Sequence, residues 1–419
     1  MPLSLKSTDQ KRDCRHHDLH SWATPLMLTC LLLLLTGCAS TRSNPSLLIS
    51  GKEAGLPADV LPMLAAQVDL DYVYDPDIRQ QEKNVALLVK RVCNLGLTTV
   101  LLQAFADPDG NDTAEELYFP NRVMPMRRNL FSGTAKALRD CGLEVYAWMP
   151  MLAFTLGPGQ DDLYVQAIKT AAGKQLVTSR NHRLSPFNQK AVTLIRKIYE
   201  DLAQSGPLDG IFFHDDAVLS DYEDASASAL AAYEEAGFPA DISRIRDNKA
   251  LMEQWSRFKT KSLINFSRSL MATVRKYYPY ARSGRNLYTL PILRPTSEQW
   301  FAQSLPLFLQ AYDYTFVLAM PSFEKAANSD HWLANLADRA LAGTVHRASL
   351  VFELQSVDWW QRHKIATTDI VAQATLLHQH GIISFAYYPD DFLRNHPEQE
   401  SMRRFFARIT SSWTRNSHD

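Results

Sequence analysis

Short apolar runs alternate with longer amphipathic segments from residue 68 almost to the end of the chain. The runs have the length and composition of buried strands, and the segments between them carry apolar residues at helical spacing. The predicted strands are Val68–Tyr74, Thr98–Phe105, Glu144–Met151, Gly210–Asp215, Ala281–Tyr288, Tyr312–Met320, Ser349–Leu354 and Ile382–Tyr388. The predicted helices are Gln80–Leu95, Ser132–Cys141, Asn188–Gln204, Ala250–Tyr277, Ser297–Leu309, Asp330–Ala342, Thr367–His380 and Asp391–Ile409.

Eight strand and helix alternations predict a single (β/α)8 barrel, a TIM-like fold, over residues 67–412. The alternative is an open doubly wound sheet, but no GxGxxG follows the first strand and there is no Walker loop. The longest connections follow strands 2 to 4, so we expect elaborated loops there. In such a barrel the C-terminal strand ends meet at one face, which is where catalytic residues are expected.

The N-terminal segment has the pattern of a lipoprotein signal peptide over residues 1–37. A polar, basic start precedes the leucine-rich run Pro25–Thr36, which is too short for a permanent membrane span. The ending Leu35-Thr36-Gly37-Cys38 resembles a bacterial lipobox, in which Cys38 is lipidated; the alternative is a secretory signal cut near Ala39. By that resemblance the protein is anchored at the periplasmic face of the outer membrane. Residues 38–66 are predicted as a tether and residues 413–419 as a C-terminal tail.

Composition changes this picture little. The chain of 419 residues is 46% hydrophobic and 21% charged, with net charge −1 and no long basic run, so nucleic acid is not an expected partner. Cys93 and Cys141 both lie in the barrel beside a glycine at a predicted helix end, and we expect two free, partly buried thiols rather than a bridge. No cysteine or histidine spacing suggests a metal ligand set, and no cofactor is expected.

The fourth apolar run ends abruptly in three ionisable residues, His214, Asp215 and Asp216. Hydrolysis of a glycosidic bond needs one carboxylic acid and one carboxylate that acts as nucleophile or base. Neighbouring strand residues point to opposite faces, so one aspartate is expected to act in the chemistry and the other to hold a neighbour. The second catalytic group should come from another strand. Glu353 follows Phe352 in the same way, and the predicted catalytic residues are Asp215, Asp216 and Glu353.

Amides, acids and aromatic rings at the other strand ends are typical of a site that binds sugars. Trp300 and Trp359 lie outside the apolar runs, and packing is as good an explanation as stacking for each. The acidic stretch around Asp221, Glu223 and Asp224 is either an exposed loop or an attraction for a cationic polymer. The predicted substrate-binding residues are His214, Gln103, Asp107, Trp148, Asn286, Trp300, Trp359, Tyr387, Tyr388 and Asp390, with His214 as a positioning group rather than a metal ligand.

Several separated segments resemble one known family: Asp71–Asp75, Leu102–Pro108, Leu117–Arg122, Tyr146–Pro150, Leu184–Phe187, Phe213–Asp216, Ser220–Asp224 and Tyr387–Asp390. They are similar to the C-terminal glycoside hydrolase domain (glycoside hydrolase family 153) of the PgaB/HmsF proteins, which process poly-β-1,6-N-acetyl-D-glucosamine in biofilm export. The resemblance implies a (β/α)8 barrel that hydrolyses the partially deacetylated polymer internally. It also implies Asp215 and Asp216 as the essential acids, and glycan contacts by Trp300, Trp359, Tyr387 and Tyr388.

One departure from that family concerns its deacetylase domain. Family members carry one between the lipobox and the barrel, whereas here only a short segment separates Cys38 from Val68. We therefore expect no deacetylase activity, with a separate deacetylase and an outer-membrane exopolysaccharide porin as candidate partners. The alternative function is a non-catalytic escort that binds the glycan during export.

Overall fold

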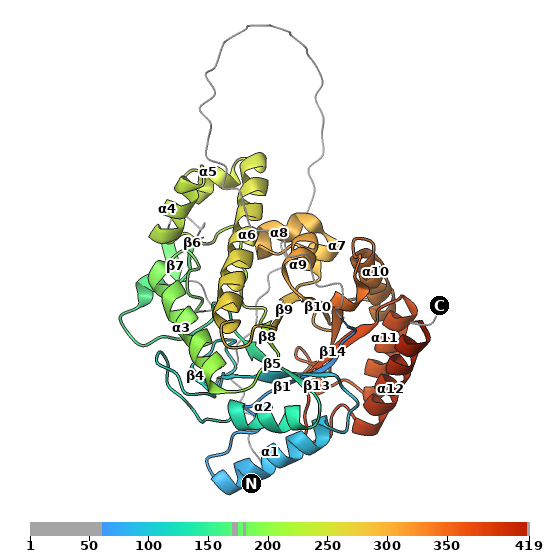
Figure 1. Cartoon of the computed structure of the whole chain (residues 1–419). Coiled ribbons are helices and arrows are strands. Elements are labelled where there is room, and N and C mark those ends of the chain that lie inside the picture. The colour runs from blue at the N-terminus through green and yellow to red at the C-terminus, as the bar shows by residue number, and fades with distance from the viewer. Residues whose placement is uncertain (1–60, 170–174, 179–181, 417–419) are drawn as a thin grey trace, which may run out of the picture. The chain divides into compact units, whose positions relative to one another are not determined.

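The structure is a computed structural model that describes residues 61–169, 175–178 and 182–416 (Figure 1). All of them fall in the second of two compact units, Glu53–Asp419. The predicted signal peptide, the lipidation site Cys38 and most of the predicted tether therefore lie outside the described residues.

Eight of the described strands are parallel and close into a barrel in chain order. Each strand pairs with the next along the chain, and β14 closes the barrel on β1 with Ala66 opposite Tyr387. Their residues are almost entirely buried, because one face of each strand lines the barrel interior and the other packs on the surrounding helices. The barrel strands are β1 (Leu64–Val68), β2 (Thr99–Gln103), β5 (Glu144–Met149), β8 (Gly210–Phe213), β9 (Arg282–Leu287), β10 (Tyr314–Ala319), β11 (Leu350–Gln355) and β14 (Ser384–Tyr388).

Helices cover the outside of this barrel, as Figure 1 shows for α1 and α2 below the strands, α3 and α6 on the left, and α10 to α12 on the right. Several have a side-chain cap at the first turn; for example, Asn188 accepts hydrogen bonds from Lys190 and Ala191 at the start of α3. The main helices are α1 (Ile78–Val92), α2 (Phe131–Asp140), α3 (Gln189–Ser205), α6 (Lys249–Val274), α9 (Leu305–Ala311), α10 (Ser329–Leu341), α11 (Thr367–Gln379) and α12 (Gln399–Asn416).

Strand β8 begins at a glycine for a steric reason. A Cβ atom on Gly210 would lie 2.6 Å from the carbonyl oxygen of Arg282 and 2.7 Å from the ring of Tyr146. The strand can therefore approach both neighbours only without a side chain at this position. This close approach fixes the base of the strand that carries His214, Asp215 and Asp216 at its other end.

The loops after β2, β5 and β8 are elaborated, which confirms the prediction for strands 2 to 4. The first holds the hairpin of β3 (Phe105–Ala106) and β4 (Glu116–Leu117), and the second that of β6 (Gln166–Lys169) and β7 (Gln175–Thr178). The third holds α4 (Ala227–Glu235) and α5 (Ile242–Arg246), which pack with α6 around an apolar cluster that includes Tyr233 and Trp255. Smaller additions are α7 (Leu290–Leu293) and α8 (Glu298–Phe301) after β9, and β12 (Val357–Asp358) and β13 (His363–Lys364) after β11.

Three regions differ most from the predicted element boundaries. The first strand begins at Leu64, inside the predicted tether, and ends at Val68, where the predicted strand began. The predicted helix Ser297–Leu309 is split into α8 and α9, because Ala302 has φ 50° and Pro306 occupies the first turn of α9. Residues 391–398 form a loop rather than the start of the last helix, which instead extends to Asn416, inside the predicted tail.

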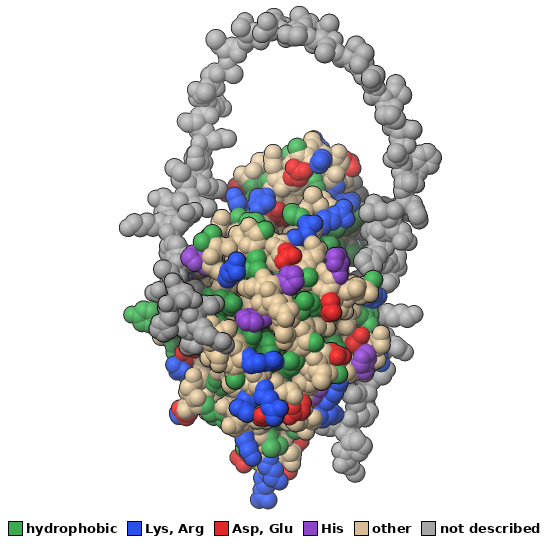
Figure 2. Space-filling model, turned by 90° about the vertical axis from the view of Figure 1, so that its right-hand side faces the viewer, with side chains coloured by type: hydrophobic (Ala, Val, Ile, Leu, Met, Phe, Trp, Pro, Cys, Tyr) green, Lys and Arg blue, Asp and Glu red, His purple; other side chains and the backbone are tan. Residues whose placement is uncertain are grey.

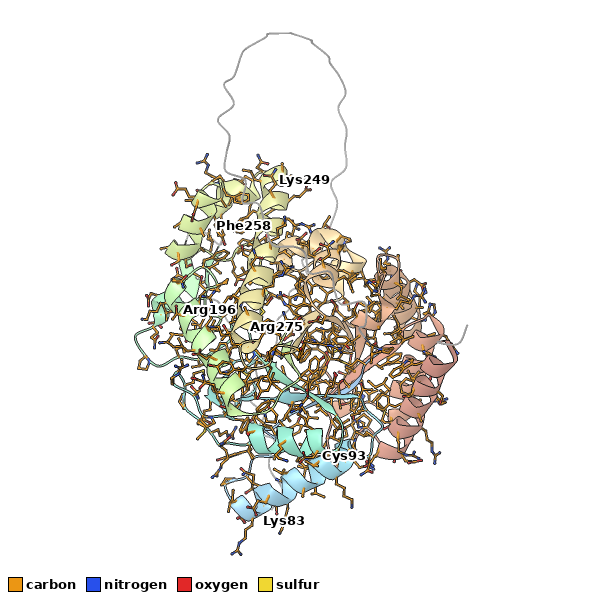
Figure 3. All side chains as sticks on the ribbon, in the orientation of Figure 1. Lys83, Cys93, Arg196, Lys249, Phe258 and Arg275 are labelled. Carbon is orange, nitrogen blue, oxygen red and sulfur yellow. A yellow bond between two sulfur atoms is a disulfide. The ribbon has the colours of Figure 1, made fainter. Side chains whose placement is uncertain are left out.

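The prediction of two free thiols is wrong. Cys93 and Cys141 form a disulfide with their Cα atoms 5.9 Å apart. Each cysteine follows the last residue of its helix, so the bridge joins the C-terminal ends of α1 and α2 (Figure 3). The sequence shows one cysteine near a glycine at the end of each helix. This pattern predicts a disulfide only if the two helices are known to be neighbours.

Candidate active site

Asp215 and Asp216 follow β8 directly but have very different environments. The carboxylate of Asp216 is buried and accepts hydrogen bonds from the backbone N–H groups of Met151 (2.9 Å), Leu152 (2.5 Å) and Ala153 (2.7 Å). It therefore fixes the start of the loop after β5. Burial raises the pKa of Asp216, and His214 and the three backbone donors oppose this rise.

Asp215 lies at the mouth of the barrel, by which we mean the C-terminal ends of the eight strands. Its side chain is 28% exposed, so it is accessible where that of Asp216 is not. The hydroxyl of Tyr288, which follows β9, donates to Asp215 Oδ2 at 2.7 Å. On the other side, His214 Nδ1 lies 3.1 Å from Oδ1 of Asp215. The hydrogen bond from Tyr288 thus orients the accessible carboxylate, and the His214 ring lies beside it without a hydrogen bond from Nδ1.

Glu353 points into the barrel from β11 and is almost fully buried. Asn286 on β9, two strands away in the sheet, donates to its Oε2 at 2.8 Å, while Oε1 is buried without a hydrogen-bond partner. Burial raises the pKa of Glu353 to about 8; the hydrogen bond from Asn286 opposes this rise and the charge of Asp215 adds to it. Glu353 and Asp215 therefore interact electrostatically, although their strands are not adjacent in the sheet.

Aromatic side chains line the mouth beside these two carboxylates. Trp148 at the end of β5 has its ring centroid 5.3 Å from that of His214 and 5.5 Å from that of Tyr388. Trp359 stacks on Tyr388 with a centroid distance of 6.0 Å. The predicted residues His214, Trp148, Tyr388 and Trp359 are thus brought together. Of these rings, Tyr388 and Trp359 are partly exposed and offer the flat apolar faces that sugar rings stack on.

A second group of polar residues lies where β1 and β2 end. Gln103 donates to Asp71 Oδ2 at 2.9 Å, and Asp71 also contacts Arg127 and Tyr118 from the loop after β2. Asp107 accepts backbone hydrogen bonds from residues 111 and 112, and burial raises its pKa to about 7 against these bonds. The predicted residues Gln103 and Asp107 therefore order this part of the mouth.

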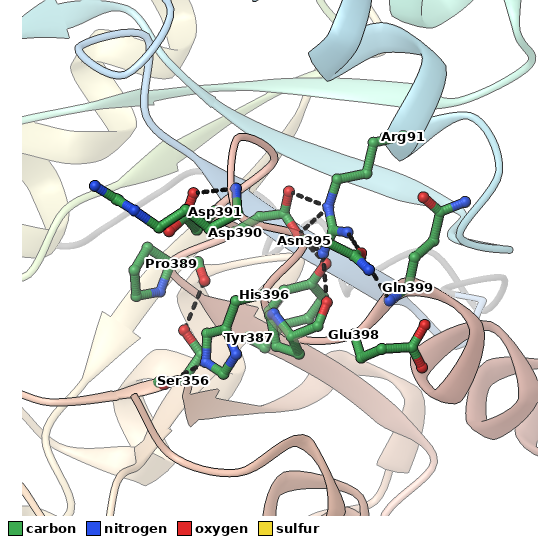
Figure 4. Close-up of polar contacts among 12 residues, drawn as sticks. Arg91, Ser356, Tyr387, Pro389, Asp390, Asp391, Asn395, His396, Glu398 and Gln399 are labelled. Carbon is green, nitrogen blue, oxygen red and sulfur yellow. Dashed lines mark hydrogen bonds and ion pairs between the residues drawn. The ribbon is translucent and has the colours of Figure 1, made fainter. Parts of the chain in front are cut away.

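Two predicted binding residues face away from the mouth. Tyr387 is buried, its hydroxyl donates to Asp390 at 2.6 Å, and its ring packs against Phe406 of α12. Asp390 is buried in an ion pair with Arg91 of α1, which holds both of its carboxylate oxygens (Figure 4). The physical reason is the alternation of a strand: Tyr388 points to the mouth, so its neighbour Tyr387 points to the helices.

The acidic loop after β8 is held by partners as well. Asp221 pairs with Arg246 and Glu223 with Arg183, while buried Asp224 accepts from Ser185. Each of the three carboxylates therefore has a partner within the protein. Their role is to hold the loop in place rather than to attract cations. Trp300, on α8, is half-buried under the guanidinium of Arg294, and no ring contact in the described part of the chain joins it to the aromatic group at the mouth.

Sequence reasoning missed Asp69 and passed over Tyr288 as a partner of the catalytic group. Asp69 is the first residue after β1 and is 6% exposed. The prediction placed the first strand four residues too late, so it assigned Asp71 to the strand end instead. The buried run Met63–Val68 before Asp69 was the available signal, because it reads as a strand once Ala65 and Ala66 are accepted as core residues.

No helix among the described residues has both the length and the apolar character needed to cross a membrane. Within residues 61–169, 175–178 and 182–416, no three His, Cys, Asp or Glu side chains are grouped so that they could hold a metal ion.

A family model described as hypothetical glycosyl hydrolase family 13 (GHL13) matches residues 67–388, which is most of the barrel. The chain belongs to this family. Among solved structures, this GHL13 chain is similar to the PgaB (BpsB) glycoside hydrolase domain from Bordetella bronchiseptica, with 42% identity and a TM-score of 0.78. That match covers 82% of this chain and 99% of the other, so the chain contains a glycoside hydrolase domain of the PgaB type.

The GHL13 chain is also 39% identical over 373 residues to a protein named poly-beta-1,6-N-acetyl-D-glucosamine N-deacetylase in Escherichia coli strain K12. The match covers 87% of this chain and 55% of the relative, so the chain spans about half the length of the curated relatives it matches. A likeness to alpha-L-fucosidase isoenzyme 2 from Paenibacillus thiaminolyticus (TM-score 0.57, 11% identity, 84% of this chain and 50% of that chain) supports the barrel fold alone.

Proposed function

We propose that this protein is an endo-acting glycoside hydrolase that cleaves partially deacetylated poly-β-1,6-N-acetyl-D-glucosamine. The observation that carries the proposal is the pair formed by Asp215 and Glu353 at the mouth of the barrel. One carboxylate is accessible, accepts a hydrogen bond from Tyr288 and lies beside His214, and the other is buried with a raised pKa. Two carboxyl groups with different environments are what acid and base roles at one pH require.

The chemistry follows from the protonation of these groups. With a pKa of about 8, Glu353 carries a proton at neutral pH and has Oε1 available as a donor. Asp215 accepts the Tyr288 hydroxyl and is the group that a bound sugar can reach. We assign Asp215 to direct action on the glycosidic bond as nucleophile or base, and Glu353 to holding the proton that the leaving oxygen takes up. Tyr388 and Trp359 supply the faces on which the sugar rings lie, with buried Trp148 packed behind Tyr388.

The substrate is suggested by relatives and by chemistry together. The E. coli relatives are named for an enzyme of poly-β-1,6-N-acetyl-D-glucosamine. Deacetylated units of such a polymer carry ammonium groups, and the mouth contains several carboxylates, Asp69, Asp71, Asp107 and Asp215 among them. Carboxylates in a partly desolvated site favour cationic sugars over neutral ones.

The test compares two neighbouring substitutions with the wild-type protein on partly deacetylated β-1,6 polymer. We expect Asp215→Asn to lower the rate of formation of new reducing ends by at least about 10²-fold at an unchanged melting temperature. Asp216→Asn should instead destabilise the fold by about 2 kcal/mol, because its amide places a donor against backbone N–H groups.

Four outcomes of this experiment are informative. Shortened oligosaccharides from the wild-type protein and none from a folded Asp215→Asn variant support the proposal. Full turnover by that variant would mean that another group acts on the bond. Polymer binding by the wild-type protein without any new reducing ends would favour the alternative, a non-catalytic glycan-binding escort. An Asp216→Asn variant that is as stable as wild type but inactive would transfer the catalytic role to Asp216.

We further propose that the protein acts at the periplasmic face of the outer membrane, anchored through lipidated Cys38. The disulfide between Cys93 and Cys141 supports export, because such bonds persist in oxidising compartments and are rare in the bacterial cytosol. A separate deacetylase that supplies the substrate and an outer-membrane porin that passes the product are the partners that this location suggests.

A further inference from the structure

Asp69 is a buried carboxylate at the mouth for which the proposed chemistry has no use. It follows β1 directly and is 6% exposed. Its Oδ1 accepts the hydroxyl of Tyr388 at a long 3.3 Å, and its Oδ2 is buried with no hydrogen-bond partner. A buried carboxylate oxygen without a donor is unfavourable in the free protein, so its retention at a strand end suggests a function.

The other carboxylates of this corner already have donors or cations. Asp71 is paired with Arg127, and Asp390 is paired with Arg91. Both oxygens of Asp107 accept backbone N–H groups. Among the described residues no lysine or arginine forms an ion pair with Asp69. Burial raises the pKa of Asp69 well above its ordinary value, and the charges of Asp71, Asp107 and Asp390 add to this effect against the bond from Tyr388.

The groups beside Asp69 have the properties of a sugar subsite. Tyr388, which contacts Asp69, lies between Trp359 on one side and Trp148 on the other. Trp148 is 3% exposed, and its indole N–H is also buried without a partner. One unpartnered acceptor and one unpartnered donor therefore flank the same tyrosine ring. A sugar that entered this corner would meet a carboxylate oxygen and an indole N–H that are both buried and unpartnered in the free protein.

We propose that Asp69 binds the ammonium group of a glucosamine unit held at Tyr388 and Trp148, and that this contact makes the site selective for deacetylated sugars. This inference rests on the proposed function and names the residue that distinguishes deacetylated from acetylated units. An N-acetyl group on the same nitrogen removes the charge and adds bulk, so an acetylated unit leaves Asp69 unsatisfied. The penalty for the wrong sugar is thus an unpaired buried carboxyl group as well as a lost attraction.

The test measures binding rather than turnover, in an Asp215→Asn background that should not cleave its ligand. The probes are the β-1,6-linked glucosamine tetrasaccharide and its fully N-acetylated counterpart, titrated by calorimetry. We expect Asp69→Asn to weaken binding of the glucosamine tetrasaccharide by about tenfold or more and to leave the acetylated one within about twofold. The uncharged form of Asp69 is already favoured by burial, so the asparagine variant should fold. Asp69→Ala provides a second variant.

Asp109→Asn is the matched control, because Asp109 is an exposed carboxylate on the same loop as Asp107. The inference is supported if only the Asp69 variants lose affinity for the glucosamine tetrasaccharide. The loss should persist at high salt, where exposed charges are screened. Equal losses in the Asp69 and Asp109 variants would show a general electrostatic attraction and overturn it, as would unchanged selectivity in Asp69→Asn. If the parent binds neither tetrasaccharide, the proposed substrate itself is overturned, and this inference with it. Binding of both without any turnover by wild type would overturn only the hydrolase proposal.

Discussion

At the scale of single residues, burial decides the properties of the carboxyl group on β11. Glu353 has one amide partner and one unpartnered oxygen, so its ionised form is poorly solvated in the folded protein and the pKa rises to about 8. The unfolded chain exposes the same group with an ordinary pKa of 4.5. Between these two values the folded protein keeps a proton that the unfolded chain has lost. The folded state is therefore destabilised progressively as pH rises through this window, and the effect is constant above it.

The raised pKa of Glu353 gives a prediction for both activity and stability. If Glu353 holds the catalytic proton, the rate of polymer cleavage should fall as pH rises through about 8, because the group then ionises. Glu353→Gln should lower cleavage by about 10²- to 10⁴-fold. It should also remove the part of the pH dependence of the unfolding free energy that lies between pH 4.5 and about 8. Urea unfolding and initial rates measured across this range check both effects. An alkaline limb that persists in the residual activity of Glu353→Gln would assign it to another group.

Residue positions could be predicted where a strand end was placed correctly. Asp215, Glu353, Trp148 and Asn286 follow from the rule that chemistry lies at the C-terminal ends of barrel strands, and the structure brings them to one face. The side to which each neighbour points was harder to predict. Which of Asp215 and Asp216 is buried depends on three backbone N–H groups of another loop, and no local pattern encodes that contact.

At the scale of elements, the bond between α1 and α2 is the contact that the sequence did not reveal. It links residues 48 positions apart and therefore closes a large loop in the unfolded chain. Restricting such a loop should stabilise the protein by about 4 kcal/mol through the chain-entropy term, provided that the native geometry is unstrained. The bond contacts neither Asp215 nor Glu353, so its effect should be on stability rather than on chemistry.

The prediction is that Cys93→Ser and Cys141→Ser each lower the unfolding free energy by this amount, about 4 kcal/mol, while kcat stays unchanged. Urea unfolding without reductant measures the effect. Wild type treated with reductant is the matched control and should unfold like either variant, and reductant should not change the variants further. Equal stability of wild type and variants would mean that the bond does not form in the folded protein, and the expectation of free thiols would then stand.

Element boundaries failed where a chain bend or a tertiary contact ended a regular pattern. The predicted helix from Ser297 was interrupted at Ala302 by a left-handed backbone, which alanine seldom adopts and which periodicity cannot show. The last helix began eight residues late because Asp390 is drawn into the ion pair with Arg91 and the chain after it turns around His396. Only the second error comes from a contact between segments far apart in the sequence.

At the scale of the whole molecule, the barrel was predictable because eight repeats of one pattern must share one core. An error of four residues in β1 did not affect the count of strands, so the fold survived a local mistake. The surface agrees with the near-neutral charge of the chain. On the face that carries α10 to α12, acidic and basic side chains are interspersed, and hydrophobic side chains are scattered among them (Figure 2). Nothing on that face indicates nucleic acid as a partner.

The location of the whole molecule gives the last prediction. If Cys38 carries lipid, wild-type protein should sediment with outer membranes and should incorporate a radiolabelled fatty acid. Cys38→Ala should release the protein into the soluble periplasmic fraction, because one deleted thiol removes all acyl chains. Its cleavage rate on soluble polymer should equal that of wild type, since the described barrel begins at Leu64, well beyond the anchor. Ser43→Ala is the matched control, because it is a single substitution close to Cys38 that leaves the Cys93–Cys141 disulfide intact, and it should leave both sedimentation and labelling unchanged. Membrane association that persists in unlabelled Cys38→Ala would show that another part of the protein makes the attachment.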